Sequence, residues 1–188
     1  MHDLTPDRTT ALHLNEVGPF SPERRDRLPD WTAILAGDRS AWNAARASAA
    51  GGPRVLIPTM VGGLAHAGVV ESLLAVALTL RGAAVEFMLC DGVLDACQLA
   101  VHDGTVSAGR LVAGELDRTL GGACHAVGSR AVDGLGLPVH RLSALTTAAD
   151  RRAALAEADA LPVDRIADYA PDGLPLGEHA IAGALRFF

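Results

Sequence analysis

The chain has 188 residues, a length that suits one domain with a buried core. Its net charge is −6 and its longest basic cluster is Arg24-Arg25, which argues against binding to a nucleic-acid backbone. The longest uncharged apolar stretch, residues 55–70, contains Pro58, three glycines and His66, so it does not resemble a membrane span. The N-terminus lacks the basic start and apolar core of a secretory signal. We therefore expect a cytoplasmic protein with no nucleic-acid partner.

Residues 1–53 differ in composition from the rest of the chain, with scattered prolines, many charges and both tryptophans. The segment LPDWTAILAGDRSAWNAARASAAGG predicts two short helices, with Asp30 capping the first and Asp38 or Ser40 capping the second. A Gly-Gly-Pro turn signal ends this region. We therefore predict a helical N-terminal extension over residues 1–53 and a main domain over residues 54–188.

A strand–helix–strand pattern begins at Arg54. RVLIPTM is a continuous apolar run of strand length, typical of a strand that is buried on both faces. Apolar residues then recur at helical spacing from Val69 to Leu78, and Gly82 is suited to end that helix. AAVEFMLCD predicts a second strand that ends at Asp91. Together these segments indicate a right-handed β-α-β unit and hence a parallel sheet.

Beyond Asp91, the sequence pattern predicts mostly helices and one more strand. GVLDACQLAV, SAGRLVAGELDRTL and ACHAVGSRAVDGLG are expected to be helical, the last two separated by Gly121-Gly122. LPVHRLSAL indicates a third strand, TTAADRRAALAEADAL a surface helix, and a last helix is expected from about Gly177. The fold class predicted is therefore α/β, a Rossmann-like parallel sheet with flanking helices.

The segment VGGLAHAG, between the first strand and its helix, is the main candidate binding loop. Gly62 and Gly63 allow a ligand to approach the backbone, and the helix start offers free N–H groups to a phosphate, a carboxylate or a sugar hydroxyl. The spacing of Gly62, Gly63 and Gly68 does not match the dinucleotide fingerprint G-x-G-x-x-G. Asp91 nevertheless ends the second strand, where a ribose-binding acid would lie. The chain has no lysine, which excludes a P-loop. The alternative is that the glycines only form a tight turn.

The stretch VLIPTMVGGLAHAGVVESLLAVALTLRGAAVEFMLCD resembles the start of GT-B glycosyltransferases and related surface-polysaccharide biosynthesis proteins. Those proteins begin with a strand, a loop containing a glycine pair, a helix ending as Leu80-Arg81-Gly82 does here, and a second strand. The resemblance covers residues 54–91 well. The segment DGLPLGEHAIAGALRFF is similar, less specifically, to a helix near the end of such N-terminal domains.

This resemblance implies the acceptor-binding half of a glycosyltransferase that acts in polysaccharide or glycosylated-metabolite biosynthesis. The acceptor would be a small molecule or glycan, and the donor a nucleotide sugar bound mainly by a second Rossmann domain. His66 would be the general base, with Gly62, Gly63, Asp91 and Glu178 binding the substrate. The alternative for His66 is a local structural role.

Catalysis would then require a C-terminal domain or a partner chain that this sequence does not supply. The terminal Arg186-Phe187-Phe188 would face that partner, or a second copy in a homodimer.

Cys90, Cys97, Cys124 and His125 form an alternative candidate site. Three thiolates and an imidazole suit a zinc ion or an Fe–S cluster. The spacing contains no C-x-x-C, and isolated cysteines usually pack in the core. No metal or cofactor is therefore firmly expected. A metal-bearing or Fe–S-bearing Rossmann-like binding module and a dinucleotide-dependent enzyme are the alternatives to the transferase.

Overall fold

The computed structural model describes residues 28–60, 62–94 and 118–184. Its contacts divide the chain into two compact units, Met1–Ala144 and Leu145–Phe188. This division differs from the predicted boundary near residue 53, because the helices before that boundary pack together with the sheet.

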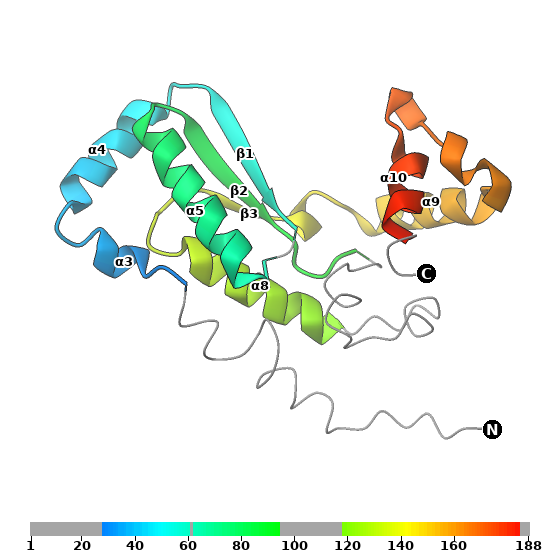
Figure 1. The fold of residues 1–188 in the computed structure, drawn as a ribbon, viewed down its shortest axis with the longest axis horizontal. Helices are drawn as coiled ribbons and strands as arrows, with labels where there is room; N and C mark the ends of the chain where they lie inside the picture. Colours follow the sequence, from blue (N-terminus) through cyan, green and yellow to red (C-terminus); the bar gives the residue numbers. More distant parts are fainter. Residues whose placement is uncertain (1–27, 61, 95–117, 185–188) are drawn as a thin grey trace, which may run out of the picture. The chain divides into compact units, whose positions relative to one another are not determined.

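The first unit combines helices with a three-stranded sheet (Figure 1). Its elements are α3 (Trp31–Ile34), α4 (Arg39–Ala49), β1 (Arg54–Thr59), α5 (Ala65–Leu80), β2 (Ala84–Leu89), α8 (Arg118–Val132), β3 (Val139–Arg141) and the 3-10 helix η1 (Leu142–Ala144). All strand pairs are parallel, in the order β1-β2-β3. The predicted α/β class and parallel sheet are confirmed, and the arrangement is compatible with a Rossmann-like fold.

Within the described ranges, helices cover only one face of the sheet. Val85, Phe87 and Leu89 of β2 are buried on the face where α5 and α8 pack. On the opposite face Leu56 of β1 is 52% exposed, and Arg54 is exposed as well. The prediction that β1 is buried on both faces is therefore wrong. Right-handed crossovers that advance in one direction, from β1 to β2 to β3, place both connecting helices on the same face.

Both tryptophans belong to the core of this unit. The Trp31 side chain is 4% exposed, and its indole N–H donates to the carbonyl oxygen of Ala131 at 3.1 Å. Trp42 is 3% exposed and donates to the carbonyl oxygen of Leu135 at 2.8 Å. With Phe87 they form part of one apolar cluster. The helices predicted before residue 53 are thus confirmed, and they complete the core of the sheet.

The two predicted caps of these helices differ. The Asp30 carboxylate accepts a hydrogen bond from the Ala33 N–H at 3.0 Å, as predicted for the first helix. Asp38 occupies the N-cap position of α4 but makes no side-chain capping bond. The start of α4 therefore depends on packing, chiefly that of Trp42, more than on its cap.

Helix α8 continues through Gly121-Gly122, so the predicted break there is wrong. A Cβ atom on Gly121 would lie 2.4 Å from the Cα atom of Gly92, and one on Gly128 would lie 3.1 Å from the Cα atom of Gly62. These glycines let α8 approach the loops after β1 and β2 at backbone distance. The missing side chain of glycine therefore allows close packing at these positions, and it does not end the helix.

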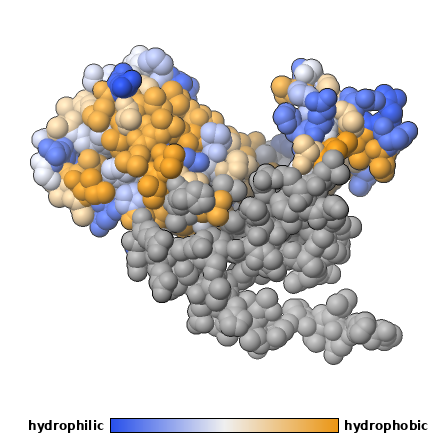
Figure 2. Space-filling view, viewed as in Figure 1, coloured by the Kyte–Doolittle hydropathy of each residue, from blue (hydrophilic) through white to orange (hydrophobic). Residues whose placement is uncertain are grey.

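Helix α5 exposes an apolar stripe on the first unit. Figure 2 shows apolar atoms gathered where α5 runs across that unit. The exposed large side chains of this helix are Val70, Leu73, Leu74 and Leu80, at 47–63% exposure. Among the helices that the structure describes, none has the length and apolar character needed to cross a membrane. The contiguous apolar stripe on α5 is typical of a site that packs against another protein surface.

The second unit is a small helical assembly. It contains α9 (Ala148–Ala160), η2 (Val163–Asp168), η3 (Pro171–Gly173) and α10 (Leu176–Ala184). The predicted surface helix and the last helix are confirmed. Thr147 and Asp150 form a capping box at the start of α9. The Gly177 N–H donates to the Tyr169 carbonyl oxygen at 2.8 Å, and this bond joins α10 to the end of η2.

The two adjacent glycines of α8 provide a test of its packing. We expect Gly121→Ala to lower the free energy of unfolding by about 1–3 kcal/mol, because the new Cβ atom would collide with the backbone of Gly92. Gly122→Ala should raise it by up to about 0.5–1 kcal/mol, because its Cβ atom would enter open space and alanine favours helix. Urea unfolding measures both. Equal effects of the two substitutions would contradict the packing described here.

Candidate functional site

The candidate site lies at the carboxyl end of the parallel sheet. The loop after β1 leads into α5, Asp91 follows β2, and Ser143 lies in η1 directly after β3. Carboxyl ends of parallel strands meet at one edge, where α/β proteins usually bind ligands. The predicted site residues Gly62, Gly63, His66 and Asp91 all follow one of the first two strands, so their backbones lie at this edge of the sheet.

Asp91 joins the ends of β2 and β3. Its Oδ1 atom accepts a hydrogen bond from the Ser143 N–H at 3.1 Å, and its Oδ2 atom accepts one from the Ser143 hydroxyl at 2.5 Å. Burial raises the pKa of this carboxyl group, but the bonds from Ser143, together with the Asp91 backbone N–H and the charge of His125, hold the pKa below its usual value. Asp91 is therefore ionised at neutral pH.

His125 of α8 is a half-buried imidazole within electrostatic reach of Asp91. Its Nδ1 atom lies 3.4 Å from the hydroxyl of Ser129, and its buried Nε2 atom has no hydrogen-bond partner among the described residues. Burial lowers the pKa of His125, and the nearby charge of Arg141 lowers it further against the opposing effect of Asp91. The ring is therefore neutral at neutral pH and is able to accept or donate a proton.

The glycine loop is packed against α8. Gly62 and Gly63 are both buried, and the Gly63 N–H donates to the thiol sulfur of Cys124 at 2.9 Å. The backbone that Gly62 approaches closely is that of Cys124 and Gly128. The tight-turn alternative thus has a physical basis in helix packing, and the ligand-binding role of this loop stays a prediction.

The start of α5 carries the predicted general base. His66 is the second residue of that helix, and its side chain lies outside the part that the structure describes. The N-cap residue Leu64 makes no side-chain capping bond. No side chain at the N-cap therefore competes with a ligand for the first N–H groups of the helix. Catalysis by His66 stays a prediction.

The cysteine alternative is only partly described. Cys124 is buried against the glycine loop and Cys90 is half-buried, whereas Cys97 lies outside the described residues. Within the described ranges, no three histidine, cysteine, aspartate or glutamate side chains are grouped to hold a metal ion. The zinc or Fe–S site stays a prediction. Glu178 lies on α10 of the second unit, and its predicted role in binding also stays a prediction.

Two polar contacts at this edge were missed by the sequence analysis. One is the contact of Ser143 with Asp91. The other joins Thr59, the last residue of β1, to Glu71 of α5 at 2.6 Å between Oγ1 and Oε2. Ser143 was missed because it lies inside the third predicted strand, LPVHRLSAL, whereas the observed β3 ends at Arg141 and leaves Ser143 just beyond the strand. Polar residues directly after parallel strands are expected to meet at one edge.

Comparisons with protein-family models, with curated proteins and with solved structures find no match for this chain.

The lowered pKa of His125 predicts a pH-dependent stability. The unfolded chain binds this proton at the ordinary pKa near 6.5 and the folded chain binds it only at lower pH, so stability rises with pH across that window. The stabilisation is complete above about pH 6.5 and is lost as the pH falls below it. We expect His125→Gln to reduce the loss of unfolding free energy between pH 7 and pH 5, measured by urea unfolding. Identical pH slopes for the two proteins would contradict this.

Proposed function

We propose that the carboxyl end of the sheet binds a hydroxylated small molecule, in the acceptor-binding half of a glycosyltransferase for polysaccharide or glycosylated-metabolite biosynthesis. The observation that carries the proposal is the ionised Asp91 carboxylate, held by Ser143 beside a neutral His125. The specific GT-B assignment rests on the resemblance over residues 54–91.

The chemistry of this edge suits sugar hydroxyl groups. A carboxylate accepts hydrogen bonds from two neighbouring hydroxyls, and Ser143 orients the Asp91 oxygens for that task. The neutral imidazole of His125 is able to accept a hydrogen bond from a hydroxyl group, and the exposed Arg141 offers N–H donors to ring or hydroxyl oxygens. The proposed general base is His66, because it belongs to the first turn of the helix at this same edge.

The surface of the first unit supports a partner for this half. Helix α5 exposes its apolar stripe, and the described helices leave the second sheet face uncovered, with Leu56 half exposed. A second domain, a partner chain or a second copy of this chain would bury such surface. In the proposed transferase that partner brings the site for the nucleotide-sugar donor.

A dinucleotide ligand is the second candidate, favoured by the position of Asp91. An acid at the end of the second strand, next to a glycine-containing first loop, is where the ribose of such a ligand is bound. The packing of Gly62 against Gly128 weighs against it, because the glycine already serves a contact within the protein. Both candidates place a pair of hydroxyl groups at Asp91.

The proposal is tested by titrating the whole chain with methyl glycosides of glucose, galactose and mannose, and separately with NAD. We expect a glycoside to shift the NMR signals of Asp91 and Ser143. Asp91→Asn should weaken binding at least about tenfold, because hydrogen bonds to a charged group contribute about 1.5–3 kcal/mol. Asp133→Asn, at an exposed carboxyl group beyond α8, is the matched control.

Binding of NAD alone would favour the dinucleotide candidate. Failure of every glycoside to bind, or equal binding by wild type and Asp91→Asn, would contradict the proposed acceptor site.

A further inference from the structure

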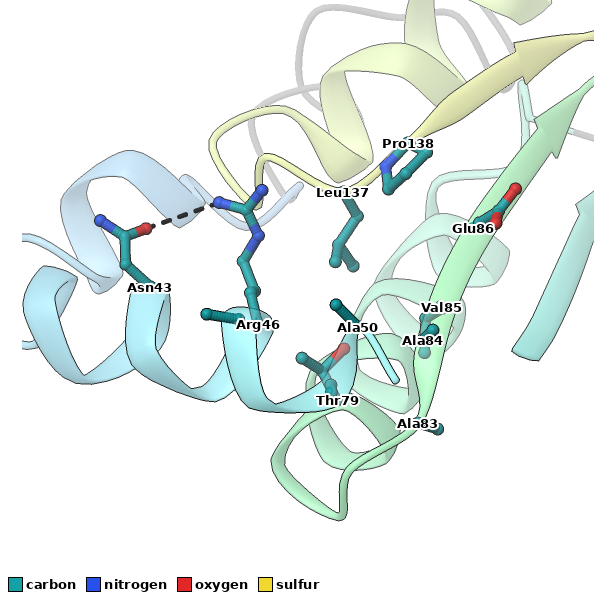
Figure 3. Close-up of a pocket in the computed structure, with 12 residues that line it drawn as sticks. Asn43, Arg46, Ala50, Thr79, Ala83, Ala84, Val85, Glu86, Leu137 and Pro138 are labelled. Atoms are coloured by element: carbon teal, nitrogen blue, oxygen red, sulfur yellow. Dashed lines mark hydrogen bonds between the residues drawn. The ribbon is translucent and has the colours of Figure 1, made fainter. Parts of the chain in front are cut away.

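A separate pocket opens at the amino end of the sheet, opposite the end that carries Asp91. Its volume is about 480 Å³, within the usual range for small-molecule sites. Figure 3 shows it between the end of α4, the end of α5, the start of β2 and the residues before β3. Its walls are mostly small and apolar, formed by Ala47, Ala49, Ala50, Ala83, Ala84, Val85, Leu137 and Pro138.

Arg46 is the cation of this pocket. Its guanidinium lies against the backbone at Gly136, where an added Cβ atom would be 2.8 Å from Nη1. Its hydrogen bond to Asn43 Oδ1 is long, at 3.5 Å, and no described carboxylate forms an ion pair with it. The side chain is thus held in place by the backbone while its charge is left without a counter-ion in the described part of the chain.

Glu86 also lines the pocket but does not neutralise Arg46. Its Oε1 atom is 2.9 Å from the guanidinium of Arg54, and its Oε2 atom is 2.7 Å from the ring of His140. Figure 3 shows the Glu86 side chain directed away from Arg46. Its carboxylate is therefore already paired on the uncovered face of the sheet, and it does not form an ion pair with Arg46.

Thr79 contributes a buried hydroxyl group. The residue is 2% exposed, and its Oγ1 atom has no hydrogen-bond partner among the described residues. Figure 3 shows the oxygen directed toward Ala50 and the pocket. A buried polar atom without a partner costs folding free energy, so a ligand atom that bonds to it gains a contact that the protein alone does not make.

Helix dipoles disfavour an anion in this pocket, because α4 and α5 both end there with their partly negative C-termini. Arg46, in the last turn of α4, also complements the dipole of its own helix. The nearby carbonyl groups are largely satisfied, however. The Ala49 carbonyl accepts from the Gly52 N–H and the Thr79 carbonyl from the Gly82 N–H, both at 2.9 Å. The full charge of Arg46 therefore outweighs the partial charges at these helix ends.

We propose that this pocket binds a small carboxylate with an apolar body. The carboxylate binds the guanidinium of Arg46, the body packs on the alanine-rich wall, and the Thr79 hydroxyl bonds to a polar atom of the ligand. A single guanidinium suits a singly charged carboxylate, and the Glu86 carboxylate in the wall disfavours a multiply charged phosphate.

The test titrates the isotopically labelled full chain with benzoate and hexanoate, and with benzamide as the neutral analogue of benzoate. We expect the carboxylates to shift the NMR signals of Arg46 and Thr79. Arg46→Met should weaken carboxylate binding at least about tenfold, whereas Arg46→Lys keeps the charge and should lose less. Arg81→Met, at an exposed arginine after α5, is the matched control and should leave binding unchanged.

Thr79→Val provides an independent measurement. It replaces the unpartnered hydroxyl with a methyl group of similar size, so its stability should equal or exceed that of wild type while carboxylate binding weakens. Equal binding of benzamide and benzoate, absence of binding by both carboxylates, or undiminished binding by Arg46→Met would each overturn the proposal. A destabilised Thr79→Val variant with unchanged binding would show that this hydroxyl has no part in the site.

Discussion

The close approach of α8 to the loops after β1 and β2 is the contact on which the first unit depends. Gly121 lies on Gly92 and Gly128 lies on Gly62, so helix and loops meet at backbone distance. This approach buries the Cys124 thiol against the Gly63 N–H. It also places His125 within electrostatic reach of Asp91. The geometry of the candidate site is therefore a consequence of glycines that carry no chemistry of their own.

The sheet accepts a packed domain on its uncovered face more readily than a further strand beside β1. The Thr59 carbonyl accepts from Cys90, so the backbone groups of Thr59 face β2 and those of Pro58 face outward. Proline has no N–H group, and it therefore interrupts the outer edge of β1 where a further strand would bond. The uncovered sheet face and the apolar stripe on α5 remain as surfaces for a packed domain or partner.

The two ends of the sheet differ in chemistry. At the carboxyl end, Asp91 and Ser143 come from loops after neighbouring strands, which suits recognition of hydroxyl groups. At the amino end, short side chains leave a cavity, and the Arg46 guanidinium in its wall forms no ion pair with a described carboxylate. The first arrangement was partly predictable, because Asp91 ends the second predicted strand, whereas Ser143 lay inside the third. The second was not, since its walls come from four separate segments.

The sequence by itself determined the local elements of this protein. The strand–helix–strand unit from Arg54, the cap at Asp30 and the glycine end of α5 depend on residues only a few positions apart, so periodicity and capping chemistry predict them. Tertiary structure alone decided that α8 runs through Gly121, that one sheet face stays uncovered, and that the Thr79 hydroxyl lacks a partner. These features arise when segments distant in the chain pack together, and no local pattern records which backbone or side chain will lie opposite.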